Sequence, residues 1–198
     1  MSHFDFLQSP MDNFISMYKE AVESKVPEAH AMVLSTVGAD SKPSSRVVYY
    51  KQLTRGEITF FTNYHGQKSI EIQKNPNVSL NFFWPALYQQ IRIEGKAEKT
   101  TFEESQKYFQ TRPRLSQLGA WASDQSQVIA DYKILEKRIE ELEKKYQGQE
   151  VPCPPHWGGF RIAAEKFEFW FGKNGRLHER YVYVKKPDGS WNKNLLNP

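Results

Sequence analysis

Five short segments rich in β-branched and aromatic residues follow one another between residues 31 and 99. Turn-forming stretches such as GADSKP at residues 38–43 separate them. Short strands at this spacing are typical of an antiparallel barrel or sandwich. The sequence therefore predicts a mainly β fold, with strands at residues 31–37, 46–51, 58–62, 78–84 and 89–99.

Helical patterns flank these strands. Ser9 and Pro10 open a helix that ends before Pro27 and carries an apolar face suited to packing rather than chemistry. A capping box at residues 101–104 starts the helix that bears Tyr108. Further elements are expected at residues 65–74 (a short helical crossover), 126–146 (an amphipathic helix), and 159–171 and 176–184 (strands joined by the hairpin turn GKNG).

Composition limits the classes of function. Aromatic residues make up 14% of the chain, so many must line a ring-binding cleft or a subunit interface. The net charge of +4 suits anionic small molecules, and no block of like charge marks a nucleic-acid tail. Cys153 is the single cysteine, has no metal-ligand spacing around it and fits a reducing compartment. With no signal peptide and no membrane-spanning run, we expect a cytoplasmic protein that binds no metal, membrane or nucleic acid.

The segment YFQTRPRLS, residues 108–116, places a phenol, two guanidiniums and a hydroxyl around a proline. Tyr108 and Arg112 are four residues apart and share one face of a helix. Pro113 is expected to stop that helix and turn Ser116 back toward them. Guanidinium binds phosphate oxygens bidentately and keeps its charge, so the pattern predicts a phosphate site. The alternative is a solvated basic helix end, because cations favour helix C-termini.

Arg176, His178 and Arg180 recur at every second position and would line one face of a strand. Two guanidiniums beside an imidazole repel each other and lower the pKa of the histidine unless an anion or an electron-rich ring lies opposite. The pattern therefore predicts a ligand there. The alternative is an edge strand whose charges block aggregation. The other histidines lack a convergent partner and are interpreted as structural or solvated: His3, His30, His65 and His156.

Weaker signals lie elsewhere in the chain. Arg46 and Lys51, five apart on a strand, point to opposite faces and so serve different groups, unless they are only the charged ends of a strand. Lys68 follows Gly66 and Gln67 at a helix start, where free backbone N–H groups favour anions.

Two further segments each have a structural and a functional interpretation. In the first, Ser123 or Ser126 caps the N-terminus of a helix, or the Gln125 amide hydrogen-bonds the edge of a heterocycle. In the second, Trp170 packs in the core or stacks on a ligand ring.

From about residue 28 to the C-terminus the chain resembles the pyridoxamine 5′-phosphate oxidase family. The motifs that carry the resemblance are RVVYYK (46–51), FFTN (60–63), GKAE (95–98), YFQTRPRLSQLGAW (108–121), QS (125–126), WGGFR (157–161), EFW (168–170) and RLHER (176–180). The resemblance implies an α+β fold, mainly β with flanking helices: a split antiparallel Greek-key β-barrel that works as a homodimer with FMN at the subunit interface. It also implies an N-terminal helical segment (residues 1–27) before a single FMN-binding domain (residues 28–198).

The resemblance also assigns roles to residues. It implies that FMN is bound by Arg46, Val47, Val48, Tyr49, Tyr50, Lys51, Phe61, Thr62, Gln67, Lys68, Gln90, Gln125, Ser126, Trp170 and Arg180. It implies that the substrate phosphate is bound by Lys51, Tyr108, Arg112 and Ser116, and that Arg176 and His178 lie over the pyridine ring as catalytic residues.

The implied reaction is the oxidation of pyridoxamine or pyridoxine 5′-phosphate to pyridoxal 5′-phosphate, with molecular oxygen as acceptor and hydrogen peroxide as product. One alternative is a related FMN oxidase of the phenazine-pathway type, against which the Tyr-Arg-Ser phosphate site argues. A second is a non-catalytic protein that binds flavin or pyridoxal phosphate, which the pair Arg176 and His178 disfavours. A nucleic-acid-binding barrel would show steep salt dependence and no flavin.

Three departures from the family pattern affect substrate handling more than fold. Gln67 stands where an arginine is usual, which removes one charge-assisted bond to the FMN phosphate. Residues 1–8 contain no Lys or Arg, so the basic arm that closes over substrate in many members is missing. The usual Arg-Leu-Ala-Pro ending reads Leu195-Leu196-Asn197-Pro198, which removes another charge.

Overall fold

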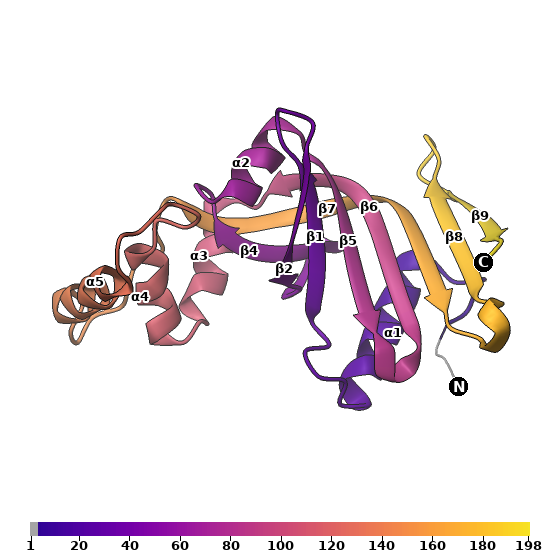
Figure 1. Ribbon diagram of the computed structural model, residues 1–198, viewed down its shortest axis with the longest axis horizontal. Helices are drawn as coiled ribbons and strands as arrows, with labels where there is room; N and C mark the ends of the chain where they lie inside the picture. Colours follow the sequence, from indigo (N-terminus) through magenta and orange to yellow (C-terminus); the bar gives the residue numbers. More distant parts are fainter. Residues whose placement is uncertain (1–3) are drawn as a thin grey trace.

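The computed structural model describes residues 4–198, so His3 and the two residues before it lie outside the described part of the chain. Within those residues, nine antiparallel strands form one strongly curled sheet (Figure 1). The strands are β1 Ala31–Val37, β2 Pro43–Tyr49, β3 Gln52–Thr54, β4 Glu57–Asn63, β5 Asn77–Trp84, β6 Gln89–Lys99, β7 Trp157–Phe171, β8 Glu179–Lys185 and β9 Trp191–Leu196. The helices are α1 Pro10–Glu23, α2 Gln67–Lys74, α3 Phe102–Gln110, α4 Arg114–Ala122 and α5 Tyr132–Lys145, with single 3₁₀ turns η1 Pro85–Leu87 and η2 Asn174–Arg176.

The sheet divides along β7. One edge of β7 pairs with β6 along nearly its whole length, while the other edge pairs with β4 at residues 157–162 and with β8 at residues 166–171. A register shift between Glu94 and Gly95 bends the β6–β7 pair, and Gly95 is needed there because the Ala163 carbonyl occupies the space of a Cβ atom. The predicted mainly β split-barrel architecture is confirmed.

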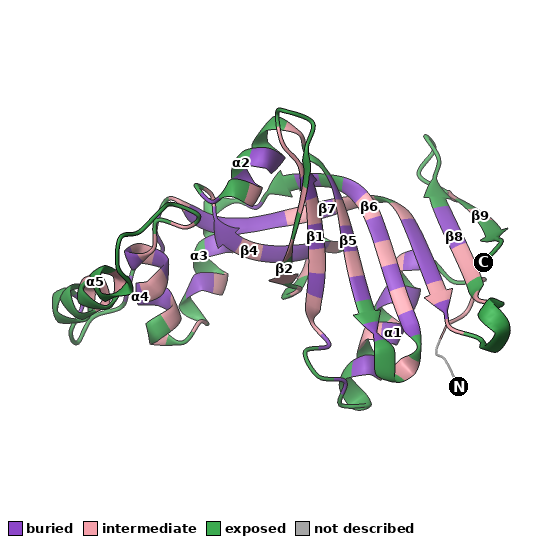
Figure 2. Ribbon diagram, in the orientation of Figure 1, coloured by how far each residue is buried: buried purple, intermediate pink, exposed green. Residues whose placement is uncertain are grey.

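The main core lies between the concave face of the sheet and α1. Phe14, Met17 and Ala21 of α1 are fully buried, and the ring of Phe14 lies 5.3 Å from that of Phe82. The prediction that the first helix packs against the fold is confirmed, whereas the domain boundary at residue 27 stays a prediction. Buried positions alternate along β5 and β6, while α5 buries no residue (Figure 2). No helix among the described residues is long and apolar enough to cross a bilayer.

A second, smaller core joins the first residue of β7 to the helices α3 and α4. Phe109 and Leu118, from α3 and α4, pack with Trp157 and with Val151 of the preceding loop. This core fixes the two helices that carry the predicted phosphate-binding residues.

Several local predictions were wrong in position. The amphipathic helix begins at Tyr132 rather than at Ser126, because Asp131 caps it and Ser126 adopts a positive φ of 70° that a helix does not tolerate. The short strands β3 and β9 and the whole of α4 were not predicted from the sequence.

Candidate active site

A pocket of about 490 Å³ opens between β2, β4 and the helices α2, α3 and α4. We call it the cationic pocket, because Lys51, Lys68 and Arg112 line it and no acidic residue does. Its lining residues are Val47, Val48, Tyr49, Lys51, Phe61, Thr62, Lys68, Tyr108, Thr111, Arg112, Pro113, Ser116, Gln125 and Trp157. The arrangement suits an anionic ligand with a flat ring.

Arg112 is the residue that most clearly indicates an anion-binding site. Its guanidinium lies over the ring of Trp157, 4.6 Å from the centroid, and its Nη1 atom is buried with no acceptor among the described residues. Burial lowers the pKa of Arg112. Because a buried N–H donor without an acceptor is costly, a ligand oxygen is the expected partner.

Two consecutive helices bring the substrate-binding candidates together. Pro113 ends α3, as predicted, but it then serves as the N-cap residue of α4 instead of sending the chain back in a loop. Ser116 therefore reaches the pocket from the first turn of a second helix. The predicted convergence of Tyr108, Arg112 and Ser116 on one pocket is observed, but the local structure that produces it is different.

Three parallel rings form one wall of the pocket. Tyr108 stacks on Phe61 with centroids 3.9 Å apart, and Phe61 stacks on Trp157 at 5.4 Å. Both interplanar angles are 11°. Together with Arg112 over Trp157, the stack fixes the positions of a phenol and a guanidinium at the pocket edge. Trp157 was missed as a site residue, although its position inside the WGGFR motif was available from the sequence.

Lys51 reaches the same pocket from the end of β2. Burial lowers the pKa of Lys51, and the nearby positive charge of Arg112 lowers it further. Its ammonium lies 4.8 Å from the centroid of the Tyr49 ring. The charge of Glu28 offsets this effect only in part, and two neighbouring cations in a pocket lined by no acidic residue favour a bound anion.

A second polar group lies at the start of α2. The Lys68 ammonium donates to Gln125 Oε1 at 2.7 Å and to Thr62 Oγ1 at 3.1 Å. The backbone N–H of Gln67 donates to Ser126 Oγ at 3.3 Å. Burial lowers the pKa of Lys68, and the nearby positive charge of Arg46 lowers it further.

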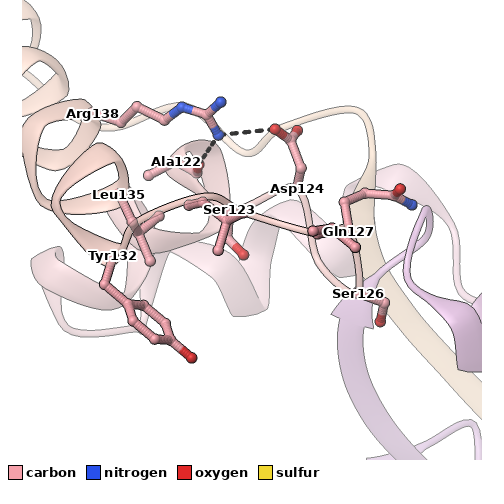
Figure 3. Close-up of a pocket in the computed structure, with 10 residues that line it drawn as sticks. Ala122, Ser123, Asp124, Ser126, Gln127, Tyr132, Leu135 and Arg138 are labelled. Atoms are coloured by element: carbon pink, nitrogen blue, oxygen red, sulfur yellow. Dashed lines mark hydrogen bonds and ion pairs between the residues drawn. The ribbon is translucent and has the colours of Figure 1, made fainter.

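The loop that carries Gln125 and Ser126 also borders a separate pocket, next to α5, which Figure 3 shows. Arg138 on α5 donates to the carbonyl oxygen of Ala122 at 3.1 Å and pairs with Asp124 at 2.9 Å. The exposed helix α5 thereby supports the loop beside the pocket.

Arg46 forms an ion pair within the protein and does not line the cationic pocket. Its Nη2 atom lies 3.1 Å from Glu71 Oε2, and Thr36 and Ser44 also donate to that carboxylate. Gln67 donates to the other oxygen, Oε1, at 2.9 Å. Arg46 is therefore fixed against α2, while Lys51 faces the cationic pocket.

Replacing Glu71 with glutamine is expected to remove part of the pH dependence of stability. Burial by itself raises the pKa of Glu71, but its hydrogen bonds outweigh burial and lower the pKa to about 2, from an ordinary value of 4.5. A carboxylate with a depressed folded-state pKa stabilises the fold above its unfolded-state pKa, and this contribution is lost as pH falls toward the folded-state value. Urea unfolding at pH about 7 and about 3.5 measures the difference.

In Glu71→Gln the loss of stability between these two pH values should be smaller than in the wild type. Glu165→Gln is the matched control, because Glu165 is 54% exposed and only pairs with Lys96 at the surface. An unchanged pH dependence in Glu71→Gln would show that the Glu71 network does not control acid stability.

The remaining predicted residues form a separate group, the β6–β8 cluster: Gln90, Trp170, Arg176, His178 and Arg180. Gln90, Trp170 and Arg180 pair across β6, β7 and β8, so their side chains share one face of the sheet. The ring of His178 lies 4.7 Å from that of Trp170.

The predicted strand face of Arg176, His178 and Arg180 is wrong. Only Arg180 lies in β8, because Gly175 and Arg176 have positive φ values of 65° and 61° and extend the turn. His178 precedes the strand, and its Nδ1 atom accepts the backbone N–H of Lys173 at 3.1 Å. His178 reaches Trp170 from a turn and Arg180 from the paired strand, so strand periodicity does not relate the three residues.

The cationic pocket and the β6–β8 cluster do not meet within one chain. No residue of the cluster lines the pocket, and Figure 1 shows α3 and α4 at one end of the long axis and β8 at the other. Tyr50 also lies apart, because its ring packs in the core against Tyr18, 4.9 Å between centroids. A ligand that contacts both groups requires two copies of the chain.

The fold and the pocket define a class: a split β-barrel protein with a cationic, aromatic-walled site for a flat anionic ligand. Residues 18–146 match the family model described as pyridoxamine 5′-phosphate oxidase, and residues 157–198 match the pyridoxine 5′-phosphate oxidase C-terminal dimerisation region. The chain belongs to the pyridoxamine 5′-phosphate oxidase family.

Curated relatives and solved structures agree with this membership. The pyridoxine/pyridoxamine 5′-phosphate oxidase of Bdellovibrio bacteriovorus is 50% identical, covering 98% of this chain and 100% of the relative. The enzyme of that name from Acaryochloris marina is 46% identical over 96% of this chain and 86% of its own. The structure of PhzG from Burkholderia lata, in complex with tetrahydrophenazine-1-carboxylic acid, superposes with a TM-score of 0.91 at 27% identity, covering 96% and 93% of the two chains. An FMN-binding protein from Nostoc punctiforme, related to pyridoxamine 5′-phosphate oxidase, shares the fold with a TM-score of 0.76 at 14% identity over 96% of this chain and 99% of that one.

Proposed function

We propose that this protein is an FMN-dependent oxidase that converts pyridoxamine 5′-phosphate and pyridoxine 5′-phosphate to pyridoxal 5′-phosphate. Molecular oxygen is the acceptor and hydrogen peroxide the second product. The observation that carries the proposal is the buried, acceptor-free Nη1 of Arg112, in a pocket it shares with Lys51, Tyr108 and Ser116. The names of relatives that are 42–50% identical to this chain support the same substrate class.

The residues present fit FMN. Lys68, Thr62, Gln125 and Ser126 group donors and acceptors at the N-terminus of α2, where the helix dipole and a full positive charge favour a phosphate. When bound there, FMN would supply the redox chemistry needed to oxidise the substrate carbon that bears the amine or alcohol. The proposed FMN residues on this side are Val47, Val48, Tyr49, Lys51, Phe61, Thr62, Gln67, Lys68, Gln125 and Ser126. Arg46 is bound to Glu71 and the Tyr50 ring packs in the core, so these two residues support the site from behind.

The chain itself binds and orients the substrate. Arg112, Lys51, Tyr108 and Ser116 hold the phosphate, which is remote from the reacting carbon, so they fix the ring without taking part in bond breaking. We assign no general base, because the positive charge of the composite site, Arg176 included, disfavours protonation of the substrate amine.

The catalytic residues come from the second subunit. Arg176 and His178 act over the pyridine ring, and Gln90, Trp170 and Arg180 contact the cofactor. They belong to the β6–β8 cluster, which the single chain holds away from its own pocket. The chain carries the family's C-terminal dimerisation region at residues 157–198, the segment that contains four of the five. A homodimer therefore has two composite sites, each built from both chains.

A cytoplasmic location is part of the proposal. Cys153 is the single cysteine, is free and is buried, and burial raises the pKa of its thiol to about 11. The protein therefore needs no oxidising compartment to fold.

The second candidate is an oxidase of a larger aromatic substrate, favoured by the TM-score of 0.91 with PhzG. Its sequence identity of 27% is well below the 50% shared with the Bdellovibrio oxidase. The phosphate-binding set of Lys51, Arg112 and Ser116 also supports a phosphorylated substrate.

Purified protein tests the proposal directly. We expect a yellow dimer by light scattering and flavin absorption, with oxygen uptake and peroxide release when pyridoxamine or pyridoxine 5′-phosphate is added. The unphosphorylated vitamers are the matched controls and should be poor substrates. A colourless monomer that takes up no added FMN would refute the assignment.

Gln67→Arg is expected to tighten FMN binding about tenfold, because it adds a charged donor at the N-terminus of α2. In the wild type the Gln67 side-chain amide donates a hydrogen bond to Glu71, so it stabilises the protein instead of binding the cofactor. Fluorescence titration of the apoprotein with FMN measures the change. Gln73→Arg on the same helix is the control, since Gln73 bonds the carbonyl oxygens of Tyr64 and Ser69 outside the cationic pocket. Equal FMN affinity in Gln67→Arg and the wild type would show that another residue already makes the contact to the FMN phosphate that an arginine here would make.

A further inference from the structure

An acidic residue is buried on the ligand side of the β6–β8 cluster. Glu168 on β7 is 4% exposed and lies opposite Arg92 on β6 and Val182 on β8. Its Oε1 atom lies 2.8 Å from Nε and 2.7 Å from Nη2 of Arg180, and its Oε2 accepts from Arg92 at 3.2 Å. One buried carboxylate thus joins arginines from the strands on both sides of β7.

Arg180 is held on a second side by the end of the chain. Its Nη1 atom donates to the carbonyl oxygen of Asn197 at 3.0 Å. All three guanidinium nitrogens therefore contact the protein, and the remaining N–H groups are the ones that can bind a ligand. Because the tail contact uses a backbone carbonyl, the unusual Leu-Asn-Pro ending of this chain preserves it.

The location of Glu168 suits a role in the site. Glu168 and Trp170 are two residues apart on β7 and share the face that carries Arg180 on the paired strand. Phe167 and Phe169 point to the opposite face and into the main core. Glu168 is therefore not part of the apolar packing that holds the sheet together.

We propose that Glu168 is the positioning residue for Arg180: it fixes the guanidinium in the orientation that binds the cofactor of the composite site. The inference rests on the proposed function and extends it to a residue with no assigned role. An arginine side chain that is already ordered loses less conformational entropy when it binds a ligand. Glu168 touches neither substrate nor cofactor, so it acts only through Arg180.

Glu168→Gln is expected to weaken FMN binding about tenfold, since the neutral amide loses the charge-assisted contacts to Arg180. Fluorescence titration of the full-length apoprotein with FMN measures this. Glu94→Gln is the matched control, because Glu94 pairs with Arg92 and Lys166 on the same face but does not contact Arg180. Its FMN affinity should stay within about twofold of the wild type.

A double-mutant cycle separates positioning from general stability. If Glu168 acts through Arg180, adding Glu168→Gln to Arg180→Ala should change FMN affinity by less than about twofold. Losses that add in full would overturn the proposal, as would wild-type affinity in Glu168→Gln. Glu168→Asp, which keeps the charge and shortens the reach, replaces Glu168→Gln in the cycle if the latter does not fold. A wild-type protein that takes up no FMN refutes the proposed function as well, whereas a failed cycle on an FMN-binding wild type refutes the positioning role alone.

Discussion

Arg112→Ala is expected to raise the KM for pyridoxamine 5′-phosphate by about 10- to 100-fold while leaving the FMN content unchanged. The guanidinium is buried against Trp157, and its Nη1 atom has no acceptor among the described residues. It is therefore already out of water, and binding a phosphate oxygen carries no further desolvation cost for this atom. Because the phosphate is remote from the reacting carbon, its loss should affect binding more than kcat. Steady-state kinetics with flavin quantification give both quantities.

Arg114→Ala is the matched control. Arg114 is adjacent on α4, but its guanidinium bonds Glu143 and the carbonyl oxygens of Tyr146 and Gln149, outside the cationic pocket. That variant should keep the wild-type KM and lose only stability. Loss of FMN in Arg112→Ala, with an unchanged KM, would mean that this group holds the cofactor phosphate instead.

Arg176→Ala is expected to lower kcat about a hundredfold, because we propose that its guanidinium lies over the substrate ring and holds the reacting carbon in position for hydride transfer. His178→Ala should lower it less, since the imidazole lies against Trp170 and mainly orients the substrate. Anaerobic bleaching of flavin absorption after mixing with substrate isolates this step from reoxidation. Lys173→Ala is the control, a cation of the same turn that pairs with Glu179 at 3.3 Å. Unchanged bleaching rates in both variants would show that Arg176 and His178 have a structural role and take no part in the chemical step.

The composite site adds a sharper test with the same variants. If Arg176 serves the partner's pocket, mixing Arg112→Ala with Arg176→Ala should restore activity at low substrate concentration. Random exchange makes about half of the dimers mixed, and each mixed dimer has one intact site of two, so about a quarter of wild-type activity returns. Mixtures no more active than their components would show that both residues serve the same pocket within one chain.

The sequence predicted most of the sheet because strand periodicity is a local signal. The alternation of buried and exposed positions along β1 and β6 follows directly from their residues. The helix α4 was missed because proline before a helix and proline after one look alike in a single sequence, and here Pro113 does both. The two short strands β3 and β9 carry too few residues for a pattern.

For the site, the sequence indicated which residues could bind a ligand but not which protein residues they contact. The sequence marked Tyr108, Arg112 and Ser116 as one group through their spacing, and the structure places them in one pocket. It gave no indication that Arg46 is engaged by Glu71, or Arg180 by Glu168, since these acids lie 25 and 12 residues away. Such pairs form only when strands and helices pack side by side.

The amino-acid sequence by itself determined the family, the mainly β fold and the identity of the candidate site residues, because these depend on local periodicity and motif order. Only the tertiary structure decided how those residues divide between two regions. The curled sheet holds α3 and α4, which flank Arg112, at one end of the long axis and β8, which contains Arg180, at the other (Figure 1), and neither helix nor strand spacing encodes that separation. The physical reason is that long-range strand pairing fixes the distance between the ends, whereas local sequence fixes only the direction of each side chain.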